Sequence, residues 1–206
     1  MKTLRPALML TAFFVLVTGL AFPFTIWAIA SVAFPSEAHG SLVRSREGRV
    51  VGSALIGQAF TRPEYFQPRP SAAGNGYDAA NSGGTNLGPS SDKLINGVKD
   101  DPATKDADET YAGFVALAKA YRERNGLAPN APIPADAATR SASGLDPDIS
   151  PANALLQSGR VARARNLSEE RVRRLVGEHT RSRVLGVFGE PRVNVLELNM
   201  ALDALK

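Results

Sequence analysis

Apolar side chains dominate the start of the chain, and no charged residue interrupts the run from Pro6 to Ser36. At about 1.5 Å per residue, a helix of this length exceeds the ~30 Å hydrocarbon core of a bilayer. Trp27 lies near the far end of the run, where an aromatic anchor at the membrane interface is expected. The pattern predicts a single transmembrane helix over residues 7–34.

A cleaved signal peptide is the alternative interpretation of this run. Lys2 and Arg5 form a basic start, and Ala28-Ile29-Ala30 or Ser36-Glu37-Ala38 offers small residues for cleavage. The apolar core of a signal peptide usually takes only about 7–15 residues, and this run is roughly twice as long. We therefore expect a retained anchor.

The charges beside the anchor leave its orientation nearly balanced. The basic residues before the run are offset by three beyond it, namely Arg44, Arg46 and Arg49. The length of the segment after the anchor favours translocation of that segment, because a domain of about 170 residues crosses the membrane largely regardless of its charge. Residues 1–6 are therefore expected to be a short cytoplasmic N-terminus, and the domain after the anchor is expected to be extracytoplasmic.

The pattern changes after the anchor. Residues 35–49 predict a linker, and Val50 to Phe60 is apolar and β-branched enough for one or two strands, with Gly52 and Gly57 marking a bend or bulge. From Thr61 to Asp106, 19 of 46 residues are Gly, Pro, Asn or Ser, and no regular period survives. Because large apolar side chains remain in this stretch, it predicts an ordered loop that packs on the rest of the domain.

Helical periodicity returns after this loop. Tyr111, Val115 and Ala118 recur at three- and four-residue spacing in a helix expected to begin at Asp108, and Gly126 supplies its C-terminal stop. An extended connector follows, because its prolines are unfavourable within a helix: Pro129, Pro132 and Pro134.

Three further helices carry capping signals. Ser150 before Pro151 predicts a helix that continues toward Arg165, with Ser158-Gly159 as a point of interruption. Ser168 predicts the cap of the next helix, and Asn194 with Glu197 predicts the last one. The apolar faces of these two helices carry Val172, Leu175, Val176 and His179, and then Val195, Leu198, Leu202 and Leu205. The predicted fold class is α+β: the transmembrane helix is followed by one extracytoplasmic domain at 50–206, with a small sheet and about four helices.

Composition excludes several kinds of chemistry. The chain contains no cysteine, which rules out disulfides, thiolate zinc sites and cysteine nucleophiles. Its formal charge is +4, and Lys2 and Arg5 account for two of these charges, so the rest is too nearly neutral to predict nucleic-acid binding. Eight arginines between positions 160 and 183 face three glutamates. We interpret them as a solvated face with ion pairs, with an acidic partner or anionic headgroups as the alternative.

Two segments offer candidate chemistry. The loop from Ser82 to Ser91 is rich in glycine and hydroxyl groups, which suits either an anion-binding nest or a tight turn, but it lacks the Gly-Lys-Ser/Thr of a phosphate-binding P-loop. Ser143, Asp146 and His179 would make a hydrolase only if folding brought them together. Asp146 and Asp148 are weak calcium candidates. We predict no catalytic residue and no metal ligand, and we assign no cofactor-binding residue.

Six strings of sequence resemble one family. In order, they are GSALIGQ (52–58), YFQPRPSA (65–72), SGGTNLGPS (82–90), SASGLDPDISPANALLQ (141–157), RVARAR (160–165) and GEPRVNVLELN (189–199). The chain closely resembles the KdpC family, the small single-span subunit of the bacterial Kdp potassium-transporting P-type ATPase. Thr85 and Asp148 stand where the family commonly has serine and histidine.

The resemblance implies an accessory subunit rather than an enzyme. Its partners would be a potassium-channel-like translocating subunit, a P-type ATPase subunit and a small one-span subunit, in the bacterial cell inner membrane with the domain in the periplasm. The chain lacks the DKTG motif of a pump. Members of the family resemble catalytic chaperones that raise the ATP affinity of the ATPase subunit, so ATP is implied through that subunit. A membrane-anchored periplasmic hydrolase and a ligand-sensing module are the alternatives.

The long loop is the expected docking surface of such a subunit, because it lacks a regular period and carries aromatic side chains. The interface candidates within it are Tyr65, Phe66, Arg69, Asn86 and Leu87. The candidates for contacts inside the membrane are Phe13, Phe22 and Trp27. The alternative is that these side chains stabilise the fold of the chain itself.

Overall fold

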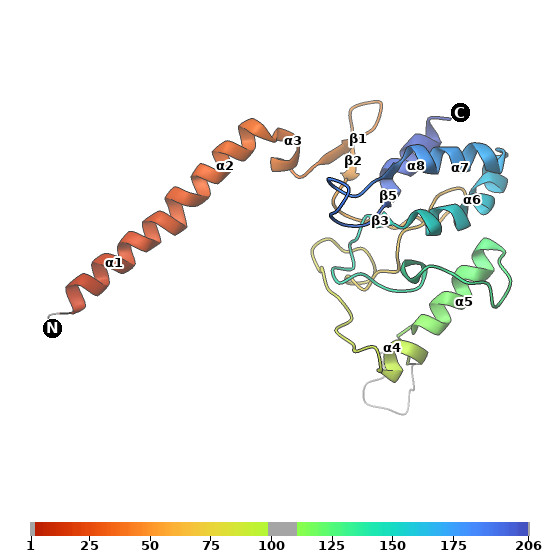
Figure 1. Ribbon diagram of the computed structural model, residues 1–206, viewed down its shortest axis with the longest axis horizontal. Coiled ribbons are helices and arrows are strands. Elements are labelled where there is room, and N and C mark those ends of the chain that lie inside the picture. Colours follow the sequence, from red (N-terminus) through yellow and green to blue (C-terminus); the bar gives the residue numbers. More distant parts are fainter. Residues whose placement is uncertain (1–2, 99–110, 206) are drawn as a thin grey trace.

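The computed structural model describes residues 3–98 and 111–205 (Figure 1). A helical segment from Leu4 to Ala33 opens the chain and stands apart from the domain, with none of its apolar window buried. It consists of α1 (Leu4–Leu16), a π-helical turn (Val17–Ala21) and α2 (Phe22–Ala33). The predicted helix is confirmed, and by length and composition it can cross a membrane.

The π-helical turn lies directly before Pro23. Proline has no backbone N–H and its ring clashes with the preceding turn of an α-helix. One extra residue in that turn changes the hydrogen-bond pattern, so that the N–H of Phe22 donates to Val17 O. Thr18 and Thr25 each donate a side-chain hydrogen bond to the carbonyl four residues earlier. The helix therefore continues through the proline.

The segment after the anchor is more regular than the predicted linker over 35–49. It contains the short α3 (Pro35–Ala38) and β1 (Leu42–Arg44), and β1 pairs antiparallel with β2 (Val50–Ser53). The register passes from Val43 opposite Gly52 to Arg44 opposite Val50, so the bulge lies beside Gly52. A Cβ at Gly52 would overlap the side chains of Gln58 and Leu196, so both would have to move if this glycine were replaced.

The long loop has little regular structure before α4 (Asp92–Asn96), and it packs on the domain as predicted for the part within 61–98. Phe66 and Ala73, from this loop, have no exposed surface. Its expected continuation to Asp106, and Asp108 itself, fall outside the described residues. The prediction that Tyr111 lies on the next helix is wrong, because the backbone N–H and carbonyl of Tyr111 bond to Val98 and the helix begins only after Gly113. The next helix, α5, spans Phe114–Asn125 and ends at Gly126 in the left-handed conformation, as predicted.

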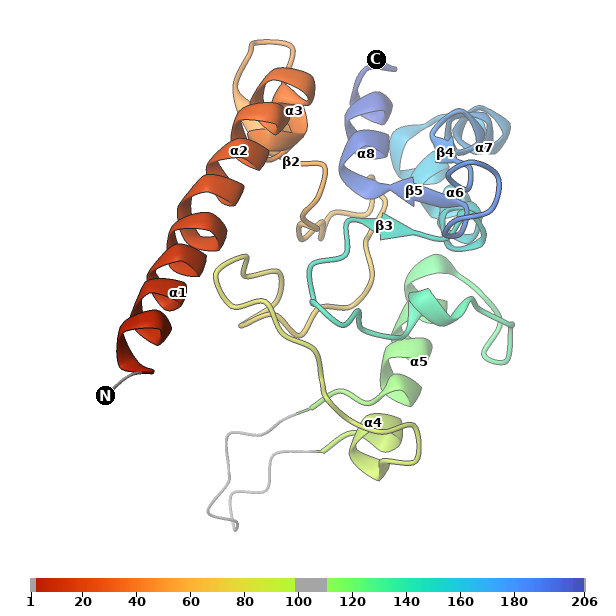
Figure 2. The ribbon, with the colours of Figure 1, turned by 60° about the vertical axis from the view of Figure 1, so that its left-hand side comes forward.

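Three helices and a small sheet complete the domain. They are α6 (Pro151–Arg165), α7 (Glu169–Glu178), α8 (Val195–Asp203), and the strands β3 (Asp148–Ile149), β4 (Thr180–Arg181) and β5 (Arg192–Asn194), in the antiparallel order β3-β5-β4. A short 3-10 helix (Ala135–Ala137) precedes β3. Figure 2 shows α6, α7 and α8 grouped around β5, with α5 and α4 to one side.

The predicted caps form as expected. The side chains of Ser150, Ser168 and Asn194 each accept a hydrogen bond from the backbone N–H three residues later. The expected interruption at Ser158-Gly159 is wrong, because α6 is continuous over both residues. The buried Ser158 hydroxyl finds its acceptor within the helix, at the carbonyl of Ala154. The core joins these helices to β3, β5 and Phe66. Its members larger than alanine are Phe66, Ile149, Val161, Val172, Leu175, Val176, Val193, Val195, Leu198 and Leu202. The α+β class is confirmed.

Candidate partner interface

Two buried amide side chains hold the long loop against the helices. Asn199 of α8 accepts from the N–H of Phe66 at 2.8 Å and donates to its carbonyl at 2.9 Å. Gln157 of α6 does the same for Gln67, at 2.8 and 2.9 Å. Each amide satisfies a backbone donor and acceptor, as a neighbouring strand would. The segment that carries the interface candidates is therefore fixed without belonging to a sheet.

Arg160 of α6 lies beneath the same segment. Its guanidinium donates to the carbonyls of Pro63 and Tyr65, to Asn125 Oδ1 and to Gln157 Oε1. The residue is only 6% exposed. Burial lowers the pKa of Arg160 to about 10, with the neighbouring Arg124 as a lesser cause, so the side chain is still cationic at neutral pH.

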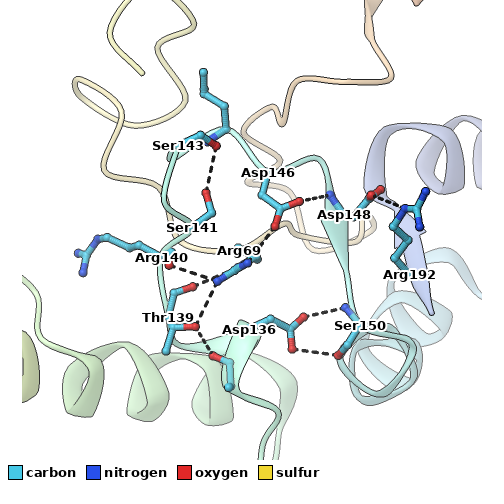
Figure 3. A network of polar contacts seen from close by, with 12 residues as sticks. Arg69, Asp136, Thr139, Arg140, Ser141, Ser143, Asp146, Asp148, Ser150 and Arg192 are labelled. Carbon is cyan, nitrogen blue, oxygen red and sulfur yellow. Dashed lines mark hydrogen bonds and ion pairs between the residues drawn. The ribbon is translucent and has the colours of Figure 1, made fainter. Parts of the chain in front are cut away.

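A polar network centred on Arg69 joins the loop to the segment before β3 (Figure 3). Arg69 Nη1 donates to Asp146 at 2.9 Å, and Nη2 donates to the carbonyl of Arg140 at 3.2 Å. Asp146 in turn accepts from the N–H of Asp148 at 3.0 Å. Arg69 is half-buried, and its charge is directed into the domain. Its role here is to hold the loop in place.

Asp148 lies beside this network and forms an ion pair with Arg192 at 3.1 Å. Partial burial raises the pKa of the Asp148 carboxyl, and the nearby Asp146 carboxylate raises it further, against the effect of Arg192. A carboxyl whose pKa is raised by folding contributes stability when protonated and loses it as the pH rises through its folded pKa. Ionised Asp148 is therefore a cost to the domain at neutral pH.

The glycine-rich loop is explained by close packing. A Cβ at Gly84 would lie 2.6 Å from the carbonyl oxygen of Ala142, and one at Gly144 would lie 2.7 Å from the N atom of Ala73. Gly144 also has a φ of +70°, which favours glycine. The N–H of Gly83 donates to Ser143 O at 2.9 Å. This geometry supports the interpretation as a tight turn over that of an anion nest.

The three residues of the hydrolase alternative each have a different structural role. Ser143 accepts from the N–H of Leu145, Asp146 pairs with Arg69, and His179 ends α7. No hydrogen bond joins any two of Ser143, Asp146 and His179 in the described parts of the chain. Across residues 3–98 and 111–205, no group of three or more His, Asp or Glu is arranged to hold a metal ion.

The interface candidates of the loop fall into three settings. Phe66 has no exposed surface and belongs to the core, so it cannot contact a partner while the domain keeps this fold. Tyr65 and Arg69 are half-buried, and Tyr65 donates to Asp203 at 3.1 Å. Asn86 is exposed and Leu87 half-buried. Tyr65, Asn86 and Leu87 thus keep surface that a partner could cover.

The candidates in the anchor are all exposed. Phe13, Phe22 and Trp27 present more than half of their surface, and none packs on the domain. They are therefore available to lipid or to neighbouring helices within a membrane.

The interpretation of the arginine-rich segment as a solvated face is wrong for Arg160 and Arg165. Arg160 is buried, and the Arg165 side chain is only 9% exposed and pairs with Asp203 at 2.7 Å. The sequence carried one signal of this, because Asn153, Gln157 and Arg160 recur at helical spacing beside the apolar positions of α6. A row of polar side chains at this spacing indicates a helix face that hydrogen-bonds to the backbone of another segment.

These features define a class of protein, namely a small α+β domain joined to one N-terminal helix that is long and apolar enough to cross a membrane. A sequence model of the family described as "KdpC: K+-transporting ATPase, c chain" matches residues 4–204. The chain belongs to this family, the accessory subunit of the K+-transporting ATPase.

Several relatives resemble the chain over nearly its whole length. Each is described as a potassium-transporting ATPase KdpC subunit. That of Caulobacter vibrioides is 50% identical over 98% of this chain and 92% of its own length. That of Gemmatimonas aurantiaca is 52% identical over 100% and 94%, and that of Rhodopseudomonas palustris is 48% identical over the full length of both. The hydrolase and ligand-sensor alternatives find no support.

Proposed function

We propose that this chain is a non-catalytic subunit that assembles with a potassium-channel-like translocating subunit, a P-type ATPase subunit and a small one-span subunit. The family match from residue 4 to residue 204 carries this proposal. The anchor supports it, because its apolar surface is unburied and can pack against other membrane helices. No cofactor is assigned to the chain itself, and ATP binds to the ATPase subunit.

The domain raises the ATP affinity of the ATPase subunit by stabilising one conformation of the complex. An extracytoplasmic domain cannot touch cytoplasmic ATP, so the coupling passes through packed membrane helices. Phe13, Phe22 and Trp27 are the contacts within the membrane. Tyr65, Arg69, Asn86 and Leu87 form or support the contact outside it, with Arg69 acting through the position of the loop.

Removing this chain from the reconstituted complex is expected to weaken the apparent ATP affinity at least about fivefold, the lower end of typical allosteric coupling. ATP titration of potassium-stimulated hydrolysis, with and without the chain, measures the effect. Adding the purified chain back to the depleted complex is the control, and it should restore the affinity. Equal apparent affinities in all three samples would contradict the proposed coupling.

The domain is expected to lie in the periplasm, because a short N-terminus stays inside and a long domain is translocated. The chain has no cysteine, so Glu123→Cys on the exposed face of α5 introduces a single thiol. A membrane-impermeant maleimide should label it in intact inner-membrane spheroplasts. Thr3→Cys, before the anchor, is the matched control and should react only after lysis. The reverse pattern would place the domain in the cytoplasm.

A further inference from the structure

The connection between β4 and β5 ends in an apolar tip made of residues 184–188, which we call the β4–β5 tip. Its large side chains are all exposed, at 54% for Val184, 85% for Leu185, 70% for Val187 and 65% for Phe188. Val184 and Phe188 exchange backbone hydrogen bonds of 2.9 Å in both directions, so the tip is a closed hairpin. The loop lies in the blue region beside β5 in Figure 1. The hairpin holds four large apolar side chains away from the core of the domain.

The backbone of the tip makes this exposure more unusual. Leu185 has a φ of +54° and Gly186 a φ of +75°, so both central residues of the turn are left-handed. Asn, Asp and Gly are the residues that favour this geometry. A leucine there is strained, and with 85% of its surface exposed Leu185 gains little from burial against the described parts of the chain. Neither the conformational preference of this turn position nor packing within the domain explains a leucine at 185. We take this as an indication that the Leu185 side chain contacts a surface outside the domain.

The chemistry of the tip suits hydrocarbon better than a protein surface. The backbone N–H groups of Val184, Gly186, Val187 and Phe188 all donate to carbonyls within residues 183–188, and the four side chains offer no donor or acceptor, which suits shallow insertion at the boundary of headgroups and acyl chains. A protein interface usually carries about one hydrogen bond per 100–200 Å². Charged groups lie at the base of the tip instead, where Arg183 pairs with Glu190 at 2.6 Å. Polar residues at this level match the headgroup region of a bilayer.

The anchor keeps the tip close to a bilayer. Only eight residues separate Ala33, at the end of α2, from Leu42, at the start of β1. Even fully extended, they span no more than about 30 Å. The domain is therefore held next to the membrane at a high effective concentration, so a small apolar contact is enough for attachment.

We propose that the β4–β5 tip inserts its four apolar side chains into the lipid bilayer that the anchor helix crosses. The domain then has two attachments to one membrane, the anchor and the tip, and together they restrict its tilt. This inference rests on the membrane anchorage of the chain but not on which face carries the domain.

The test uses the full chain in lipid nanodiscs of phosphatidylcholine and phosphatidylglycerol. Leu185→Cys carries a spin label, and its collisions with oxygen, which concentrates in lipid, are compared with those of a water-soluble nickel chelate. We expect the Leu185 label to resemble a label at Val15→Cys in the anchor. Glu123→Cys is the exposed control in water. A Leu185 label that resembles the Glu123 label, while the Val15 label is in lipid, would overturn the proposal and leave the anchorage intact.

Two other outcomes would also overturn it. A Val15 label in contact with the nickel chelate would remove the anchorage and, with it, the proposal. The Leu185 label could also be shielded from both oxygen and the nickel chelate, and only in the complete complex. That result would show that the tip contacts a protein partner and not lipid.

A second variant separates insertion from folding. Leu185→Asn relieves the strain of the turn and should raise the thermal midpoint in detergent by about 2–4 °C. With the spin label at Val187→Cys, the same substitution should move the tip toward water and increase nickel-chelate collisions severalfold. Val115→Asn, an exposed apolar position on α5, is the matched control and should leave the Val187 label unchanged. A Val187 label unmoved by Leu185→Asn would contradict insertion.

Discussion

Replacing Arg160 by alanine is expected to lower the free energy of unfolding of the domain by about 3–5 kcal/mol. The guanidinium is buried, and it is shared among two backbone carbonyls of the long loop and two side-chain amide oxygens. Its removal leaves four acceptors without this donor in a place that water reaches poorly. It also removes the two hydrogen bonds by which Arg160 holds the loop carbonyls of Pro63 and Tyr65 to α6.

Urea unfolding of the full chain in detergent, followed by circular dichroism, measures the loss. Arg163→Ala on the same helix is the matched control, because Arg163 is exposed, and it should change stability by less than about 0.5 kcal/mol. Arg160→Lys keeps a charge but cannot reach all four acceptors, so it should rescue only part of the loss. An Arg160→Ala variant as stable as Arg163→Ala would show that the network carries no stability.

Changing Asn199 to aspartate is expected to produce a domain that is unstable at neutral pH and nearly normal in acid. A protonated aspartic acid can accept from the N–H of Phe66 and donate to its carbonyl, as the amide does. An ionised carboxylate loses the donor and brings a buried charge against the Phe66 carbonyl oxygen. The loss at neutral pH should reach about 2–4 kcal/mol.

The sign of this pH dependence follows from linkage. Burial raises the pKa of the introduced Asn199→Asp carboxyl above the unfolded value of about 3.9, so the unfolded chain releases its proton first as the pH rises. Stability is then retained below about pH 4 and lost as the pH increases. Unfolding midpoints of Asn199→Asp between pH 4 and pH 8 measure the loss. Asn75→Asp, in the exposed part of the same loop, is the control. A constant deficit across this range would contradict the two-point contact with Phe66.

The elements that local rules predict formed where expected. The anchor follows from an uninterrupted apolar run, and the starts of α6, α7 and α8 follow from Ser150, Ser168 and Asn194. These signals work because each depends on residues within one or two turns of the helix. The end of α5 at Gly126 is of the same kind. Helix starts and ends that depend on nearby residues can therefore be predicted from the sequence alone.

Features that depend on distant partners were misread or missed. The sequence predicts a linker where β1 forms, because a three-residue strand is defined only by its pairing with β2. The sequence predicts Phe66 at the surface, because its burial depends on packing with α8 and its loop has no regular period. The sequence predicts a solvated Arg160, because its hydrogen-bond acceptors come from segments up to 97 residues away.

The sequence by itself therefore determined the anchor, the capped helices, the absence of cysteine chemistry and the resemblance that gives the family. Only the tertiary structure decided which polar groups face inward, because a buried arginine or asparagine is stable only where distant backbone completes its hydrogen bonds. It also decided that Leu185 lies in a left-handed turn and is 85% exposed. That position depends on how β4 and β5 meet, and no short stretch of sequence encodes it.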